Sequence, residues 1–148
     1  MKVVIQRVLN SKIVIDKAQE KNIKNGLMIL LGMTYNDTKE DIDYLIKKIL
    51  NLRIFTDEFD KMNYSVSDIK GDILVAPQFT LYANTKKGNR PSFENALEPS
   101  KANELFEVFK SEIIKSGLNI EFGKFGSHME ITLTNNGPVT IIIDSKER

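Results

Sequence analysis

The chain of 148 residues is long enough for one domain with a substantial core, and its apolar fraction of 41% and charged fraction of 28% are ordinary for a globular protein. It has no cysteine and one histidine, which excludes disulfides, a catalytic thiol and any metal site that needs thiolates or two imidazoles. A net charge of +1 argues against a protein that coats nucleic acid, but it allows one local basic patch. No apolar run approaches the ~20 residues of a membrane helix and no signal-peptide pattern follows Met1, so we expect a cytoplasmic protein without a membrane span.

β-branched residues dominate the beginning of the chain. The clusters at 3–5 and 13–15 predict two strands, with a turn at Asn10 and Ser11 between them. Arg7 lies in the first of these strands, where an arginine is usually exposed, and an inward-facing Arg7 would need a carboxylate or carbonyl partner. Residues 27–32 are apolar on both faces and predict a central strand.

Two helices are predicted from apolar residues at helical spacing. The first begins after Thr38, which can cap it, and its apolar stripe is typical of core packing. The second is expected to be capped by Ser100, to run to Ser116 and to end at Gly117 in a left-handed conformation.

The loop at 56–61 carries three carboxylates within four residues, which raises the question of a calcium site. It lacks the alternating ligand pattern and the central glycine of a calcium-binding loop. The sequence therefore predicts no metal site, and nothing in it points to a cofactor.

The run at 73–76 predicts a buried strand that Pro77 interrupts, because proline has no N–H to give to a ladder. Three further strands are predicted nearer the end of the chain, at 118–122, 129–134 and 139–143. The order of strands, helix, strands, helix, strands predicts a single α+β domain over residues 1–148, with two main helices and a curved, mainly antiparallel, barrel-like sheet.

Gln78 and Thr80 are uncharged hydrogen-bonding residues within an otherwise apolar segment. Buried polar side chains cost stability unless protein, water or a ligand satisfies them. A bulged strand whose backbone bonds to these side chains would account for them without any function. A ligand that bonds to them is the alternative.

The segment Asn136, Gly137, Pro138 also allows two interpretations. It can be the turn of a last hairpin, with proline as the first residue of a strand. It can also hold a cis Gly–Pro bond, which would fix the neighbouring carbonyl groups in an unusual direction.

Taken together, Gln-Phe-Thr-Leu-Tyr-Ala at 78–83 and Asn-Gly-Pro-Val-Thr at 136–140 resemble the D-aminoacyl-tRNA deacylase family. Four further segments match the same family in the expected order: residues 3–8, 48–55, 87–93 and 123–126. The resemblance therefore spans essentially the whole chain.

This resemblance implies a homodimer that hydrolyses the ester between a D-amino acid and the 3′ end of tRNA. Gly137 and Pro138 would form a cis dipeptide that one subunit inserts into its partner's pocket, where its carbonyls leave no room for an L side chain. Glycine has no side chain to exclude, so glycyl-tRNA could also enter. Arg7 matches the residue expected to brace the dipeptide by bonding its carbonyl.

The resemblance places the chemistry at Gln78, Phe79 and Thr80. An aminoacyl ester is already activated, so hydrolysis needs positioning and an oxyanion site more than a strong base. We expect the backbone N–H groups around Phe79 and Thr80 to hold the ester carbonyl, the Thr80 hydroxyl to bond the substrate, and Gln78 to shape the site. A nucleophilic Thr80 is the alternative, but no adjacent base is evident in the sequence. The 2′-hydroxyl of the tRNA could orient the water, and His128 is expected to be a strand-end residue rather than the general base.

The loop at 84–93 contains Lys86, Lys87 and Arg90. Charge runs are usually solvated surface, and a loop that contacts phosphates is the alternative. Given a tRNA substrate, we expect these three cations to meet the acceptor stem, with an influence that falls as salt rises.

Pro77 departs from the family motif, which normally has serine before the glutamine. A related deacylase group, associated with mischarged L-alanyl-tRNA, carries Pro-Gln at this point, whereas Val139 and Thr140 match the D-specific type. We therefore expect D-specific activity. Two alternatives stay open: relaxed or L-alanyl-tRNA specificity, and a non-catalytic dimer that binds RNA ends or a small ligand.

Overall fold

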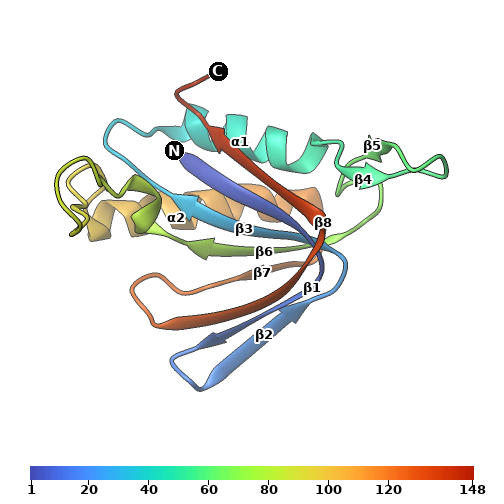
Figure 1. The fold of residues 1–148 in the computed structure, drawn as a ribbon, viewed down its shortest axis with the longest axis horizontal. Helices are drawn as coiled ribbons and strands as arrows, with labels where there is room; N and C mark the ends of the chain where they lie inside the picture. Colours follow the sequence, from blue (N-terminus) through green and yellow to red (C-terminus); the bar gives the residue numbers. More distant parts are fainter.

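The long first strand, β1 (Lys2–Ile15), organises the sheet in the computed structural model, which describes residues 1–148 (Figure 1). Along one edge β1 pairs antiparallel with β8 (Met129–Asp144) over almost its whole length. Along the other edge it pairs first with β3 (Gly26–Gly32) and then with β2 (Gln19–Ile23), both antiparallel. β1 therefore has three neighbouring strands, because it bends between the part that pairs with β3 and the part that pairs with β2.

Two parallel pairs complete the sheet. β6 (Asp72–Pro77) runs parallel to β3, and β7 (Ile120–Phe122) runs parallel to β6. The sheet curls until β2 approaches β7, where Lys21 Nζ donates to the carbonyl oxygen of Phe122 at 2.8 Å. The predicted curved, mainly antiparallel α+β fold with two main helices is confirmed, with parallel pairing only on either side of β6.

Helices α1 (Lys39–Asn51) and α2 (Pro99–Ile113) cover the same face of the sheet (Figure 1). α1 begins as predicted after Thr38, whose backbone N–H donates to the Asp41 carboxylate at 2.9 Å. Both helices bury apolar stripes in one large core cluster with β1, β3 and β6. No helix of the structure combines the length and apolar composition needed to cross a membrane.

The expected cap of the second helix is wrong. Glu98, not Ser100, is the N-cap residue of α2, and its carboxylate accepts the Lys101 backbone N–H at 3.1 Å. Pro99 occupies the first helical position, where its missing N–H costs nothing. After α2, a short 3₁₀ turn, η2 (Ile114–Ser116), ends at Gly117 with φ of 73°, so the predicted left-handed end is confirmed.

Two predicted turns are absent. The chain continues through Asn10 and Ser11 as part of β1, and through Asn136 and Gly137 as part of β8. The register between β1 and β8 shifts on both sides of Val8, so bulges take up the extra residues that the turns were expected to contain. The last hairpin predicted from the sequence is therefore one long bent strand.

A small hairpin of β4 (Phe55–Thr56) and β5 (Met62–Tyr64) follows α1 at one end of the molecule. Its loop contains the three carboxylates of the segment 56–61. Asp57 accepts the backbone N–H groups of Phe59 and Lys61 at 2.8 and 2.9 Å, which gives this carboxylate a turn-forming role.

The two ends of the chain meet in an ion network around two buried carboxylates. The α-amine of Met1 donates to Asp37 Oδ1 at 2.5 Å and to Ser145 Oγ at 2.8 Å. Asp41, almost fully buried at 2% side-chain exposure, accepts from Lys146 at 2.8 Å and Arg148 at 2.9 Å. This network attaches the last residues to the start of α1.

Candidate active site

A cavity of about 610 Å³ opens at the C-terminal end of β6, where the start of α2 and the loop after β7 meet. Its walls are mainly apolar and come from segments far apart in the sequence: Pro77, Phe79, Phe93, Leu97, Phe125, Met129 and Ile131. The few polar side chains belong to Gln78, Glu98, Ser127 and His128. A largely apolar cavity with a small number of placed polar groups is typical of a ligand-binding site.

Gln78 lines this cavity, whereas Thr80 follows just beyond Phe79 and is not among the lining residues; neither lies in a strand. The backbone N–H of Gln78 donates to the Leu31 carbonyl at 2.8 Å, and the chain then turns into a 3₁₀ helix, η1 (Phe79–Tyr82). Gln78 Nε2 donates to Thr80 Oγ1 at 2.5 Å. The bulged-strand interpretation is wrong, because β6 ends at Pro77. The expectation that both side chains are buried is also wrong, because Gln78 is half-buried and Thr80 is exposed.

Phe79 and Phe93 form the aromatic rim. Their rings meet edge to face with centroids 4.9 Å apart, and Phe79 remains 53% exposed. Phe79 and Thr80 are the first residues of η1, so their backbone N–H groups have no carbonyl partner within that helix. Phe79 lines the cavity and Thr80 follows it, so two backbone donors without a partner in η1 lie close to the Gln78 side chain.

Glu98 supplies the one carboxylate of the cavity lining. The hydroxyl of Ser100 and then the backbone N–H of Lys101 hold the pKa of Glu98 below its usual value. His128 also lines the cavity, just before β8 begins, as the sequence predicted, with Nε2 3.7 Å from the Glu130 carboxylate.

The Gly137–Pro138 peptide bond is cis and lies in the middle of β8, where Gly137 has φ of 135°. Arg7, only 7% exposed, faces inward beside it. Arg7 Nε donates to the Asn136 carbonyl at 2.9 Å, and Nη1 donates to the Ile54 carbonyl at 2.5 Å. Arg7 thus has the carbonyl partners that an inward arginine needs, but it bonds the carbonyl before the dipeptide rather than one within it.

The dipeptide does not line the cavity of its own chain. Ile131 of the cavity and Gly137 are six positions apart on β8, or roughly 20 Å along a strand. Arg7 pairs with Leu27 of β3, and Leu27 pairs with Ile73 near the start of β6. Pro77, which lines the cavity, is at the other end of β6. The site residues predicted from the sequence therefore form two groups at opposite ends of the sheet.

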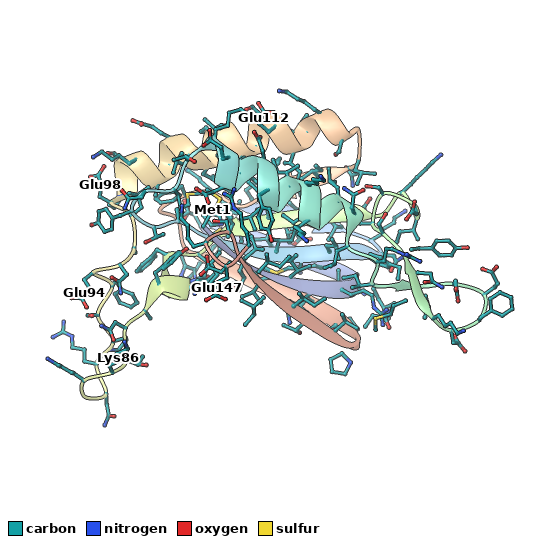
Figure 2. The ribbon with its side chains drawn as sticks, turned by 90° about the horizontal axis from the view of Figure 1, so that it is seen from above. Met1, Lys86, Glu94, Glu98, Glu112 and Glu147 are labelled. Carbon is teal, nitrogen blue, oxygen red and sulfur yellow. The ribbon has the colours of Figure 1, made fainter.

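The loop with Lys86, Lys87 and Arg90 is exposed and none of the three side chains forms an ion pair. Figure 2 shows this loop, labelled at Lys86, extending from the body at the same end as Glu98. Asn84 and Ser92 pair at its base, directly before Phe93 of the cavity rim. Three free cations thus flank the cavity.

Sequence reasoning missed much of the apolar wall. The sequence places Phe125 only in a segment that resembles the family, and Met129 and Ile131 only in an alternating strand. One signal was available in the sequence, the glycines at 123 and 126 on either side of Phe125. In the structure, a Cβ at Gly123 would come within 2.7 Å of Met129 Sδ. Such a close approach marks a place where a loop packs against the next strand.

The fold and the cavity define a small α+β protein with an aromatic-rimmed pocket at one end of its sheet, and the family model for D-Tyr-tRNA(Tyr) deacylase matches residues 4–144. The chain belongs to this family. It is 56% identical to the D-aminoacyl-tRNA deacylase of Aquifex aeolicus (strain VF5) and 50% identical to that of Clostridioides difficile (strain 630), each over 99% of both chains. The resemblance deduced from the sequence is thereby confirmed.

Two solved structures share the fold. One is named "c-Myc DNA Unwinding Element Binding Protein" and is 36% identical, with a TM-score of 0.90 over 97% of this chain and 98% of the other. The other is described as "a probable eukaryotic D-amino acid tRNA deacylase", with a TM-score of 0.85 over 96% and 97% of the two chains. At 16% identity the second supports the fold alone.

Proposed function

We propose that this protein hydrolyses the ester bond of D-aminoacyl-tRNA and releases the free D-amino acid and tRNA. The observation that carries the proposal is a family match over residues 4–144 together with two relatives, at 56% and 50% identity, that are named D-aminoacyl-tRNA deacylase. The cavity is consistent with it, because the terminal adenosine and an aminoacyl group need a mostly apolar pocket with a few fixed polar groups. Charged tRNA is consumed in the cytoplasm, where we expect the protein to act.

The chemistry proposed here needs no strongly basic side chain. Water attacks the ester carbonyl carbon, the carbon–oxygen bond to the ribose breaks, and the ribose oxygen leaves as a protonated hydroxyl. The backbone N–H groups of Phe79 and Thr80 would stabilise the oxyanion as it forms, since preorganised donors act where charge develops. The 2′-hydroxyl of the substrate would orient the water.

Gln78 and Thr80 act as a pair in this proposal. Because Gln78 Nε2 donates to Thr80 Oγ1 at 2.5 Å, the hydroxyl proton of Thr80 is free to point elsewhere. Thr80 can therefore donate to the substrate without serving as the nucleophile. A nucleophilic threonine would need a base to take its proton, and its hydrogen-bond partner here is a neutral amide donor.

We infer that two copies of the chain form the working unit. The Gly137–Pro138 dipeptide lies roughly 20 Å along β8 from the cavity of its own chain, so it can enter a cavity only in a second copy. Near the dipeptide, β8 is an edge strand, and Ile142 and Leu9 of the β8–β1 ribbon are 67% and 51% exposed. Apolar side chains at this exposure are consistent with a surface that a partner covers.

In such a dimer the dipeptide would exclude L-amino acids by occupying the space that an L side chain needs. Arg7 would fix the position of this wedge through the Asn136 carbonyl, with its other end held by Ile54. Asn135 adds a second brace, because its Oδ1 accepts the Val139 N–H at 2.9 Å across the dipeptide. Glycine would escape this exclusion, so glycyl-tRNA belongs to the proposed substrate range.

Pro77 bears on the amino-acid specificity of this chain, because the family motif normally has serine at this position. It is buried and forms part of an apolar floor with Met129 and Ile131. No side-chain hydroxyl is present at this position, so the proposed mechanism relies on the donors that follow Pro77. Relaxed or L-alanyl-tRNA specificity is the alternative outcome.

A second candidate is a non-catalytic dimer that binds nucleic-acid ends. The observation in its favour is the name of the 36% identical structure, a DNA unwinding element binding protein. One assay separates the two functions. Purified protein is incubated with D-tyrosyl-tRNA and L-tyrosyl-tRNA, and released amino acid is measured beside tRNA binding. Rapid release of D-tyrosine supports the deacylase, and binding without release supports the alternative.

A further inference from the structure

A second hollow lies at the end of α1, away from the cavity described above. It has a volume of about 490 Å³, and six residues line it: Tyr44, Lys47, Lys48, Asn51, Leu52 and Arg53. Figure 1 shows this end of α1, beside the β4–β5 hairpin, at the opposite side of the molecule from the loop at 84–92. The hollow has three cations and no acidic residue in its lining.

The cations of this hollow are not used by the fold as ion-pair partners. Lys47 and Lys48 are exposed and form no salt bridge, and the Lys48 ammonium lies 5.6 Å from the centroid of the Tyr44 ring. By contrast, Lys39 at the start of the same helix binds Asp43 at 2.7 Å. The unpaired charge therefore gathers at one end of α1.

Arg53 completes the group. Its Nε and Nη2 donate to the carbonyl and side-chain oxygens of Asn63, both at 2.7 Å, so its partners are neutral. The negative end of the α1 dipole accounts for a lysine in the last turn, but Arg53 lies beyond the helix. A hydrogen-bonded guanidinium and two exposed ammonium groups without salt bridges form a set that suits phosphate oxygens.

The position of the hollow suggests which phosphates it meets. Arg7 donates both to the Asn136 carbonyl, next to the Gly137–Pro138 dipeptide, and to the carbonyl of Ile54, next to Arg53. One buried side chain thus links the dipeptide to the residue that directly follows the hollow. In the proposed dimer, a wedge seated in the partner's cavity would carry the hollow with it toward the rim of that cavity.

We propose that the basic hollow binds the phosphate backbone of the tRNA acceptor stem whose 3′ end occupies the partner's cavity. The inference rests on the proposed function, because that function places an aminoacyl end in the cavity and a wedge from the second copy beside it. The loop with Lys86, Lys87 and Arg90 flanks the cavity of its own chain, so the stem would lie between cations of both subunits.

The test measures binding of uncharged tRNA to the full-length protein at several salt concentrations. Lys47→Gln, Lys48→Gln and the double variant each remove charge from the hollow, and Lys39→Gln is the matched control on the same helix. Removing one lysine that binds a phosphate should reduce the slope of log affinity against log salt by about 0.9 for duplex RNA, taking the value for DNA duplexes. We expect the double variant to reduce the slope more than either single variant does, and Lys39→Gln to keep the wild-type slope.

A second substrate separates binding of the stem from chemistry. The double variant should hydrolyse the D-tyrosyl ester of adenosine, which has no acceptor stem, with wild-type kcat/KM, while KM for D-tyrosyl-tRNA rises. Equal slopes for the double variant and Lys39→Gln would overturn the inference, as would an equal decrease in kcat/KM on both substrates. A reduced slope in the double variant, together with a wild type that releases no D-tyrosine, would contradict the proposed function and support the phosphate site.

Discussion

Arg7 and Asn136 are joined by a 2.9 Å hydrogen bond from the guanidinium Nε to the backbone carbonyl, across two strands that the sequence separates by most of the chain. The same guanidinium reaches the Ile54 carbonyl at 2.5 Å. A buried arginine is costly unless its donors are satisfied, and here two backbone carbonyls satisfy it next to the proposed wedge. The side chain therefore couples the position of β8 to the position of the segment after α1.

Replacing Arg7 should destabilise the protein. Arg7→Met leaves one buried and one partly buried carbonyl group without donors, which should lower the free energy of unfolding by roughly 2–5 kcal/mol. Arg7→Lys keeps the charge but can reach only one carbonyl, so its effect should be smaller. Urea unfolding measures both. The control is Arg53→Met, which removes a similar pair of hydrogen bonds from an exposed arginine and should cost about 1 kcal/mol or less. Equal costs at the two positions would contradict a special role for Arg7.

Thr80→Ala tests whether the backbone N–H groups or the Thr80 hydroxyl carries the catalysis. If backbone N–H groups stabilise the oxyanion, the variant lacks only one hydrogen bond to the substrate, and kcat should fall by about tenfold. If Thr80 attacks the ester, kcat should fall by roughly four to six orders of magnitude. Single-turnover release of D-tyrosine distinguishes these outcomes. Thr80→Ser, which keeps a hydroxyl beside Gln78, should retain most of the activity.

Pro77→Ser asks whether the missing hydroxyl matters. The proline lines the cavity, and its Cδ lies 3.3 Å from where a Cβ at Gly123 would be. The N–H of the next residue, Gln78, already donates to the Leu31 carbonyl. Since neither group is part of the proposed oxyanion site, kcat for D-tyrosyl-tRNA should stay within about threefold, less than the effect of one hydrogen bond. A large gain in rate, or a switch between D-tyrosyl-tRNA and L-alanyl-tRNA, would instead assign catalysis or specificity to this position.

The ion network around the buried Asp41 predicts a pH dependence of stability. Burial alone would raise the pKa of Asp41, but hydrogen bonds from Lys146, Ser145, Thr38 and Arg148 outweigh it and hold the pKa far below its ordinary value of 3.8. Because the folded pKa is depressed, the stabilisation is fully present above the ordinary value and disappears as pH falls below it.

Asp41→Asn should therefore cost about 3 kcal/mol at pH 7 and clearly less at pH 3, where the same contribution is already reduced in the wild type. Urea unfolding at the two pH values gives the comparison. Asp43→Asn, at an exposed carboxylate paired with Lys39, is the control and should change stability by about 0.5 kcal/mol or less. A cost of Asp41→Asn that is the same at both pH values would refute the electrostatic origin.

Local signals were enough to predict a large part of this fold. The two-faced apolar run of β3, the stripe of α1 after Thr38 and the left-handed end at Gly117 each depend on residues close together in the sequence. The inward arginine was also predictable in part, because a cation in a β-branched strand must find carbonyl or carboxylate partners if it is buried.

The rest depended on partners that the sequence does not reveal. The continuity of β1 and β8 comes from their pairing with each other, which turns apparent turn residues into bulges. The parallel pairing of β3 with β6 likewise reflects tertiary packing. The Glu98 cap is local instead, since Pro99 occupies the first helical position and Glu98 accepts the Lys101 N–H. The cavity needed all of these, since its walls come from the end of β6, the start of α2 and the start of β8.

The most direct test of the account compares single-turnover hydrolysis of D-tyrosyl-tRNA and L-tyrosyl-tRNA by the wild type and by Gly137→Ala. Gly137 has φ of 135°, which L residues rarely adopt, and a Cβ there would approach Val139 Cγ2 to 2.8 Å and Arg7 Nη2 to 3.1 Å, so the substitution strains the proposed wedge. Urea unfolding establishes that the variant is folded. We predict that the wild type cleaves the D-ester far faster than the L-ester and that Gly137→Ala brings the two rates together. A wild type that cleaves both esters equally, or a folded variant with unchanged discrimination, would contradict it.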